Sequence, residues 1–182
     1  MAERSCAVTG FLGGTHLYYR VVKERPIIMM LMEGRKEMTV LLVEDDLNDI
    51  FLVKRAFKKA NIPHPLQVAT DGVEALQYLI GEGRFTNRRL HPLPHLIIMD
   101  LKMPRKTGLE VLEWIKKDGF LRRIPVIIVS SSDHPSDINQ AYALGANAYM
   151  VKPVDLQVLQ ELLSRVYLER YEERERVKGS AQ

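Results

Sequence analysis

Residues 39–46 read TVLLVEDD, a short strand-like run followed directly by three carboxylates. A continuous apolar run of this length is typical of a strand buried on both faces, as in a parallel sheet. Ile50, Val53 and Phe57 then recur at helical spacing, and Pro63 predicts the end of that helix. The stretch therefore predicts a strand, an acidic strand end and a helix, which is the opening unit of a parallel α/β fold.

The same alternation of short apolar runs and amphipathic segments continues along the chain. Strands are predicted at 39–43, 66–69, 96–99, 126–129 and 148–151. The helices after the first are predicted from Asp71-Gly72, at 109–117, at 136–144 and from Leu156 to Val166. Five strands that alternate with five helices predict an α/β protein with a doubly wound, five-stranded parallel sheet and right-handed crossovers. In such sheets chemistry gathers at the carboxyl ends of the strands.

The chain divides into a patterned central part and two flanks. Residues 1–38 show no sustained strand or helix period, and Met38 stands directly before the first strand. This segment is interpreted either as a flexible extension or as an upstream start assignment, with translation beginning at Met38 or an earlier internal Met. Residues 39–168 are predicted to form one domain, and residues 169–182 a charged extension of the last helix or a tail.

Charge and composition exclude several classes of protein. The net charge is +3, and the first 38 residues supply +2 of it, because they hold six Lys/Arg against four Asp/Glu. The remaining chain is nearly balanced and has no electrostatic footprint for DNA. The single cysteine, Cys6, fits a reducing compartment, and no apolar run approaches the roughly 18 residues of a membrane span. We expect a cytoplasmic protein that contacts neither DNA nor membrane.

Polar side chains stand at four of the predicted strand ends. The first strand ends in Glu44-Asp45-Asp46, the third in Asp100, the fourth in Ser130 and the fifth in Lys152. Crowded carboxylates are tolerated where a hard cation neutralises them, and Mg²⁺ prefers carboxylates, water and phosphate oxygens. A carboxylate that attacks phosphorus also needs a metal, a cation and a hydroxyl donor to shield the incoming charge. These strand ends supply that set.

Four motifs carry a resemblance to the receiver domain of response regulators. They are VEDD at 43–46, LIIMDLKMP at 96–104, IIVS at 127–130 and YMVKP at 149–153. The spacing of 30 residues from Asp100 to Ser130, and of 22 from Ser130 to Lys152, is similar to that family's. The resemblance covers about residues 39–168 and implies a flavodoxin-like sheet with strand order 2-1-3-4-5, flanked by five helices.

The resemblance implies a metal site and a phosphoacceptor. Asp100 matches the aspartate that is phosphorylated and that also ligates Mg²⁺. Glu44 and Asp45 match the acidic pair that holds Mg²⁺ directly or through water, and the backbone carbonyl of Lys102 should complete the protein ligands. Asp46 is a neighbouring acid of lesser role. Taken alone, acids after a strand more often cap a helix than bind a metal.

The resemblance also implies a switch. Ser130 matches the hydroxyl that reaches a phosphoryl oxygen, and Lys152 matches the lysine that pairs with another. The Lys152–Pro153 peptide bond is expected to be cis, a form open to proline. Tyr149 matches the aromatic residue that turns inward as Ser130 closes on the phosphoryl group.

The implied function is that of a stand-alone, CheY-like response regulator in a two-component system. A sensor histidine kinase supplies the phosphoryl group, and no room remains after about Val166 for an output domain. The signal should therefore leave by a protein contact or by onward phosphotransfer. The only expected activities are self-phosphorylation from phosphodonors and slow autodephosphorylation. A homodimer through the face of helix four, strand five and helix five is a further expectation.

One feature points to a subfamily of these regulators, and a second sets this chain apart from many relatives. The long connection Gly81–Pro94 and the stretch DLNDIFLVKRAF at 46–57 are similar to regulators of bacterial and cyanobacterial phytochrome histidine kinases. Lys102 stands where many relatives have a smaller polar side chain, so an unusual autophosphatase lifetime is expected, with its direction left open.

Two other classes of function share part of this pattern. A phosphatase of the haloacid-dehalogenase kind also uses an aspartate nucleophile and Mg²⁺, but it wants a second acid where Lys102 stands. A flavodoxin-like cofactor binder wants a hydroxyl- and glycine-rich phosphate loop after the first strand, where Glu44-Asp45-Asp46 would repel a phosphate. The sequence argues against both.

Overall fold

The computed structural model describes residues 7–12, 15–20, 38–59, 64–154 and 158–159. The predicted last helix has only Val158 and Leu159 inside these ranges, both of them helical and buried. The predicted tail, residues 169–182, lies outside them. Within the described part of the chain, no helix is both long and apolar enough to cross a membrane.

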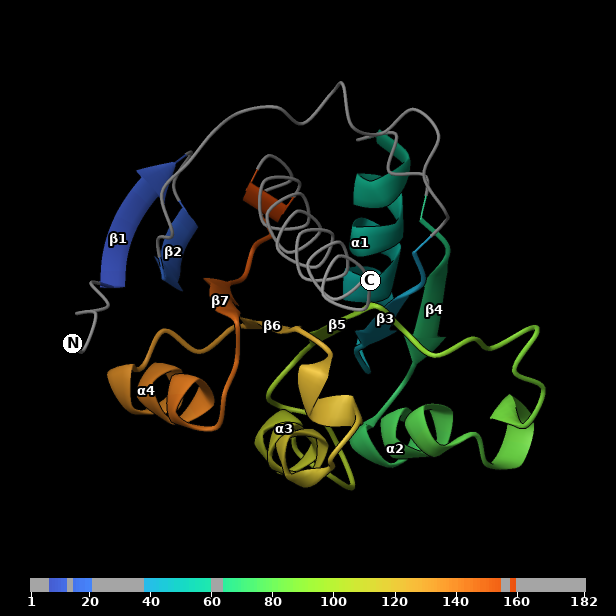
Figure 1. Cartoon of the computed structure of the whole chain (residues 1–182). Helices are drawn as coiled ribbons and strands as arrows, with labels where there is room; N and C mark the ends of the chain where they lie inside the picture. The colour runs from blue at the N-terminus through green and yellow to red at the C-terminus, as the bar shows by residue number, and fades with distance from the viewer. Residues whose placement is uncertain (1–6, 13–14, 21–37, 60–63, 155–157, 160–182) are drawn as a thin grey trace, which may run out of the picture.

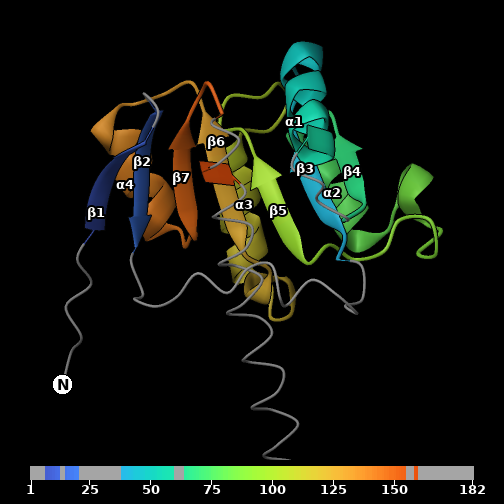
Figure 2. The ribbon, with the colours of Figure 1, turned by 90° about the horizontal axis from the view of Figure 1, so that it is seen from above.

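The centre of the molecule is a run of five parallel strands. They are β3 (Val40–Val43), β4 (Leu66–Ala69), β5 (Leu96–Met99), β6 (Val126–Ser130) and β7 (Ala148–Val151). Their order across the sheet is β4-β3-β5-β6-β7, and every neighbouring pair is parallel. This is the predicted order 2-1-3-4-5, seen from above in Figure 2, and the flavodoxin-like fold class is confirmed.

Helices cover both faces of this sheet. The described helices are α1 (Leu47–Lys59), α2 (Gly72–Ile80), α3 (Gly108–Lys117) and α4 (Pro135–Ala143), with short 3₁₀ turns at Gly83–Phe85 and Leu121–Arg123. Figure 1 shows α1 on one face and α2, α3 and α4 on the other. All strand residues of β3, β5 and β6 are buried, because helices cover both sides of these strands.

Alternate residues of each strand belong to two separate cores. Leu41 and Val43 pack with α2, α3 and α4 in one cluster, whereas Val40 and Leu42 pack with α1 in the other. Val158 and Leu159 join the α1 cluster. The period-2 alternation of side chains therefore divides one apolar run between the two layers.

An antiparallel hairpin extends the sheet beyond β7. Strands β1 (Ala7–Leu12) and β2 (Thr15–Arg20) pair with each other, and β2 pairs with β7, so that the described residues form a sheet of seven strands. Two stretches of the segment expected to be a flexible extension or an upstream start thus form strands. The assignment of residues 1–38 as a whole stays a prediction. The missed signal is Gly13-Gly14 between two runs rich in β-branched and aromatic residues, a sequence typical of a tight hairpin. The edge of β7 also offers unpaired backbone groups to such a strand.

The connection from α2 to β5 folds back onto α2. The helix ends at Gly81, whose φ of 78° is the left-handed conformation that glycine adopts freely. Arg88 donates from Nη1 to the Tyr78 carbonyl and from Nη2 to the Leu79 carbonyl, both at 2.7 Å. The Tyr78 hydroxyl donates to the Pro92 carbonyl at 2.7 Å. The long segment predicted as a loop is therefore attached to the end of the helix.

Candidate metal and phosphoacceptor site

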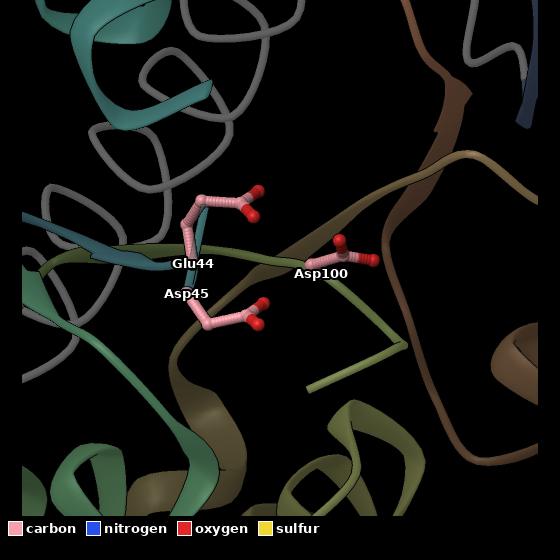
Figure 3. Close-up of side chains that lie close together, drawn as sticks. All are labelled: Glu44, Asp45 and Asp100. Carbon is pink, nitrogen blue, oxygen red and sulfur yellow. The ribbon is translucent and has the colours of Figure 1, made fainter. Parts of the chain in front are cut away.

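Three carboxylates meet at the carboxyl edge of the sheet. Glu44 and Asp45 follow β3, and Asp100 follows the adjacent β5, with Val43 and Met99 paired in register. One oxygen from each of the three carboxylates lies within 4.8 Å of the others, and Figure 3 shows Asp100 across from the two acids of β3. Glu44 and Asp100 are buried and Asp45 is exposed. A set of hard oxygen donors open to solvent on one side fits a divalent cation such as Mg²⁺.

Lys152 binds this acidic group from the end of β7. Its Nζ donates to Glu44 Oε2 at 2.7 Å, to Asp100 Oδ2 at 2.8 Å and to Asp49 Oδ2 at 2.6 Å. Burial alone would lower the pKa of Lys152, but the hydrogen bonds to Asp100, Asp49 and Glu44 outweigh it and raise the pKa above its usual value. The side chain is therefore a fixed cation whose three donors are all in use.

Both burial and the neighbouring Asp100 raise the pKa of Glu44. Burial raises the pKa of Glu44 above its usual value, and the hydrogen bond and charge of Lys152 offset only part of that effect. The negative charge of Asp100 raises it further. A divalent cation bound beside Glu44 would favour its charged form, because a nearby positive charge lowers the pKa of a carboxyl.

Backbone contacts fix Asp100 in place. Its N–H donates to the Val43 carbonyl at 3.0 Å, and the Lys102 N–H donates back to Asp100 Oδ1 at 3.1 Å. The first residue of α3, Gly108, donates to the Leu101 carbonyl at 2.9 Å. A Cβ at Gly108 would overlap the Asp100 carbonyl. The approach of α3 to the strand end therefore requires glycine at this position.

Ser130 and Tyr149 lie in a second hydrogen-bonded group beside the acids. Both are fully buried. Ser130 Oγ accepts from the Ser132 N–H at 3.3 Å, and the Tyr149 hydroxyl donates to the Ser132 carbonyl at 2.8 Å. Burial raises the pKa of Tyr149, so the phenol stays a donor. Ser132 Oγ donates in turn to Asp137 Oδ2 at 2.6 Å, which links the group to the first turn of α4.

The structure places the predicted residues as follows. Glu44, Asp45, Asp100 and Lys152 converge, and Ser130 is joined to Lys152 through the backbone, because the Lys152 N–H donates to the Ser130 carbonyl at 2.8 Å. The Lys152–Pro153 bond is cis, as expected. Lys102 is exposed and contacts Asp100 through its backbone N–H; the role of its carbonyl as a metal ligand stays a prediction.

Asp46 caps α1 and is not one of the three clustered acids. Its Oδ1 accepts from the Asn48 N–H at 2.7 Å and from the Asp49 N–H at 3.2 Å. Sequence reasoning missed Asp49, Ser132 and Asp137. Asp49 could have been found because it is an acid in the first turn of the helix that follows Glu44-Asp45-Asp46. Side chains in that turn point back toward the strand end.

The fold and this edge of the sheet define a receiver module of two-component signalling. The model of the response regulator receiver domain matches residues 40–164, well over half of the chain. The chain therefore belongs to the response regulator receiver domain family, and the resemblance noted in the sequence is confirmed.

Its relatives include response regulators named for phytochromes. Response regulator Rcp1 of Synechocystis sp. is 35% identical over 134 residues, which are 74% of this chain and 89% of that protein. The phosphorylated cyanobacterial phytochrome response regulator RcpA is 37% identical with a TM-score of 0.62, over 72% of this chain and 91% of that one. A structure of the Mn²⁺-bound form of Rcp1 is 36% identical with a TM-score of 0.61, over 71% and 91%.

These comparisons make the chain a response regulator homologous to the phytochrome response regulators, and the family implies phosphorylation on aspartate. The acidic group and the Mn²⁺-bound relative together support a divalent cation as its cofactor.

Proposed function

We propose that this protein accepts a phosphoryl group on Asp100 from a sensor histidine kinase, with Mg²⁺ bound by Glu44, Asp45 and Asp100. The Lys102 carbonyl is proposed as a further ligand. The observation that carries the proposal is the convergence of three carboxylates and the Lys152 ammonium at one edge of the sheet, with Lys152 Nζ 2.8 Å from Asp100 Oδ2. An aspartate that attacks phosphorus needs such cationic partners and metal ligands beside it.

The transfer itself is a displacement at phosphorus. A carboxylate oxygen of Asp100 forms the new O–P bond, and the P–N bond of the phosphohistidine breaks with its electron pair going to the imidazole. A cation held by Glu44, Asp45 and Asp100 would neutralise charge on the carboxylates and on the transferred group. Lys152 stabilises the negative charge that develops on the phosphoryl oxygens, and the Lys102 N–H orients Asp100 through Oδ1.

The signal follows from a change in the buried group around Ser132. We expect the Ser130 hydroxyl to turn toward a phosphoryl oxygen, which would weaken its contact with the Ser132 N–H. Ser132 also holds the Tyr149 hydroxyl and Asp137 of α4. Phosphorylation therefore shifts the population of arrangements at α4 and β7, and with it the affinity for a partner.

The partner is proposed to be a phytochrome-type histidine kinase in the cytoplasm, because RcpA, one of the relatives named above, is a phytochrome response regulator. The signal leaves by contact with a downstream protein or by onward phosphotransfer. Beyond self-phosphorylation and slow autodephosphorylation, no enzymatic turnover is proposed.

Intact mass after incubation with acetyl phosphate and Mg²⁺ tests this function. The wild-type chain should gain one phosphoryl group, and Asp100→Asn should gain none, because the amide is not a nucleophile. Chelation of the metal should abolish the gain in the wild type. Labelling of Asp100→Asn at another site would contradict the assignment of Asp100. Sustained turnover of small phosphoesters would favour the phosphatase alternative.

A further inference from the structure

We propose that Asp49 is a positioning residue for the phosphoryl transfer. It keeps the Lys152 ammonium at the site while the cation and the phosphoryl group engage Glu44 and Asp100. This inference rests on the proposed function of Asp100. Asp49 lies in the first turn of α1, on a different element from the three clustered acids, and it is not a member of that trio.

The hydrogen bonds of Lys152 single out Asp49. Its bond to Asp49 Oδ2, at 2.6 Å, is the shortest of the three that Lys152 Nζ donates to carboxylates. The other two acceptors, Glu44 and Asp100, are both in the proposed metal site, and Asp100 is also the group that becomes esterified. Asp49 is the acceptor that neither ligates the cation nor changes covalently. It can therefore keep its contact with Lys152 Nζ while the other two acceptors are engaged.

A lysine side chain needs such a restraint. Four rotatable bonds give it many conformations, and most of them would remove the ammonium from the strand end. Phosphorylation requires Lys152 to exchange its contact with Asp100 Oδ2 for a phosphoryl oxygen nearby. With Asp49 as a fixed partner, this exchange is a short movement of an ammonium that is already in place.

The position of Asp49 is itself set by the start of the helix. Asp46 Oδ1 accepts from the Asp49 N–H at 3.2 Å, which fixes the first turn of α1 beside the strand ends. The competing explanation is that Asp49 only stabilises α1, since an acid in the first turn interacts favourably with the helix dipole. That role acts on helix stability and does not depend on Lys152, so the two explanations predict different results.

The first test compares Asp49→Asn with a matched control, Asp46→Asn. Both changes remove one negative charge at the start of α1, and asparagine keeps the Asp46 cap because its carbonyl oxygen can still accept. The measurement is the initial rate of Asp100 phosphorylation by acetyl phosphate at fixed Mg²⁺, read by intact mass. We expect Asp49→Asn to lower the rate about tenfold. Asp46→Asn should stay within about twofold, and Asp49→Glu should recover part of the loss.

The second test combines Asp49→Asn with Lys152→Met in a double-mutant cycle. If Asp49 acts through Lys152, Asp49→Asn should have no further effect on the rate once the ammonium is gone. An equal loss in both backgrounds would overturn the proposal. So would an unchanged rate in Asp49→Asn when the wild type is phosphorylated. A wild type that takes no phosphoryl group would instead contradict the proposed function itself.

An independent readout is the NMR signal of the Lys152 ammonium. In the wild type the three hydrogen bonds should slow its exchange with water enough for detection. The signal should be lost or displaced in Asp49→Asn and kept in Asp46→Asn. An unshifted signal in Asp49→Asn would overturn the proposal even if both variants were less stable.

Discussion

Asp100 depends on Gly108 for its position, although the two residues are eight apart in the chain. A Cβ at Gly108 would overlap the Asp100 carbonyl. We therefore expect Gly108→Ala to displace the acceptor, to slow its phosphorylation by acetyl phosphate and to lower the free energy of unfolding by about 2 kcal/mol. Phosphorylation rate and urea denaturation measure the two effects.

Gly119→Ala is the matched control for this substitution. No atom lies within 4 Å of the Cβ position at Gly119, so alanine there should leave the phosphorylation rate unchanged. Gly108→Ala with a wild-type rate and stability would show that α3 can retreat from the strand end without moving Asp100.

The acids, the lysine and the hydroxyl could be placed from sequence because each follows directly on a strand. Parallel strands in one sheet bring their carboxyl ends to the same edge, so a residue at a strand end needs no side-chain geometry to be located. Asp49 and Asp137 lie in the first turns of α1 and α4, and Ser132 lies in a loop. Which way such residues point depends on packing and on caps such as Asp46, and the sequence pattern does not show that.

At the scale of elements, the long connection Gly81–Pro94 between α2 and β5 is held against the end of α2. Arg88 joins it to α2 through two charge-assisted hydrogen bonds to carbonyls at the helix end. We expect Arg88→Ala to lower the free energy of unfolding by about 1–2 kcal/mol, because it leaves these carbonyls without that donor. Urea denaturation followed by circular dichroism measures the loss.

The neighbouring Arg89 provides the control. It is exposed, and its backbone N–H rather than its side chain donates to Asn87. Arg89→Ala should therefore change stability by less than about 0.5 kcal/mol. Equal effects of the two substitutions would mean that lost positive charge, and not the bonds to α2, explains the result.

The start of the third helix shows how closely a boundary can be predicted. The sequence pattern predicts a helix from Leu109, and in the structure it begins at Gly108, after the capping box of Thr107 and Glu110. The sequence also shows that the Gly81–Pro94 segment is long. It does not show that the segment folds back onto α2, because that depends on the hydrogen bonds from Arg88 to the Tyr78 and Leu79 carbonyls.

At the scale of the whole molecule, the parallel strand order could be predicted because alternating strands and helices with right-handed crossovers allow few arrangements. The hairpin β1–β2 could not be placed in the same way. A hairpin can pair with any open strand edge, and its choice of β7 depends on long-range register, such as Tyr18 opposite Tyr149. The predicted homodimer face also includes β7, so the hairpin and a second copy would compete for this strand.

A chain that begins at Met38 tests this competition. It keeps the parallel sheet and should fold, but the edge of β7 is then unpaired. We expect faster hydrogen exchange at the β7 amides and more self-association than in the full chain, measured by mass spectrometry and sedimentation velocity. Unchanged exchange at β7 in the shorter chain would show that β2 does not protect this strand in solution.

One margin of the parallel sheet is occupied by a part of the same chain, because β2 pairs with β7. At the opposite margin the side chain of Gln67 on β4, rather than its backbone, donates from Nε2 to the Leu90 carbonyl at 3.2 Å. A protein that recognised this regulator by adding a strand beside β7 would first have to displace β2. Helix surfaces and the loops around Asp100 require no such displacement. We therefore expect partners that bind on the β7 side to discriminate through side chains, which makes their specificity open to redesign by surface substitution alone.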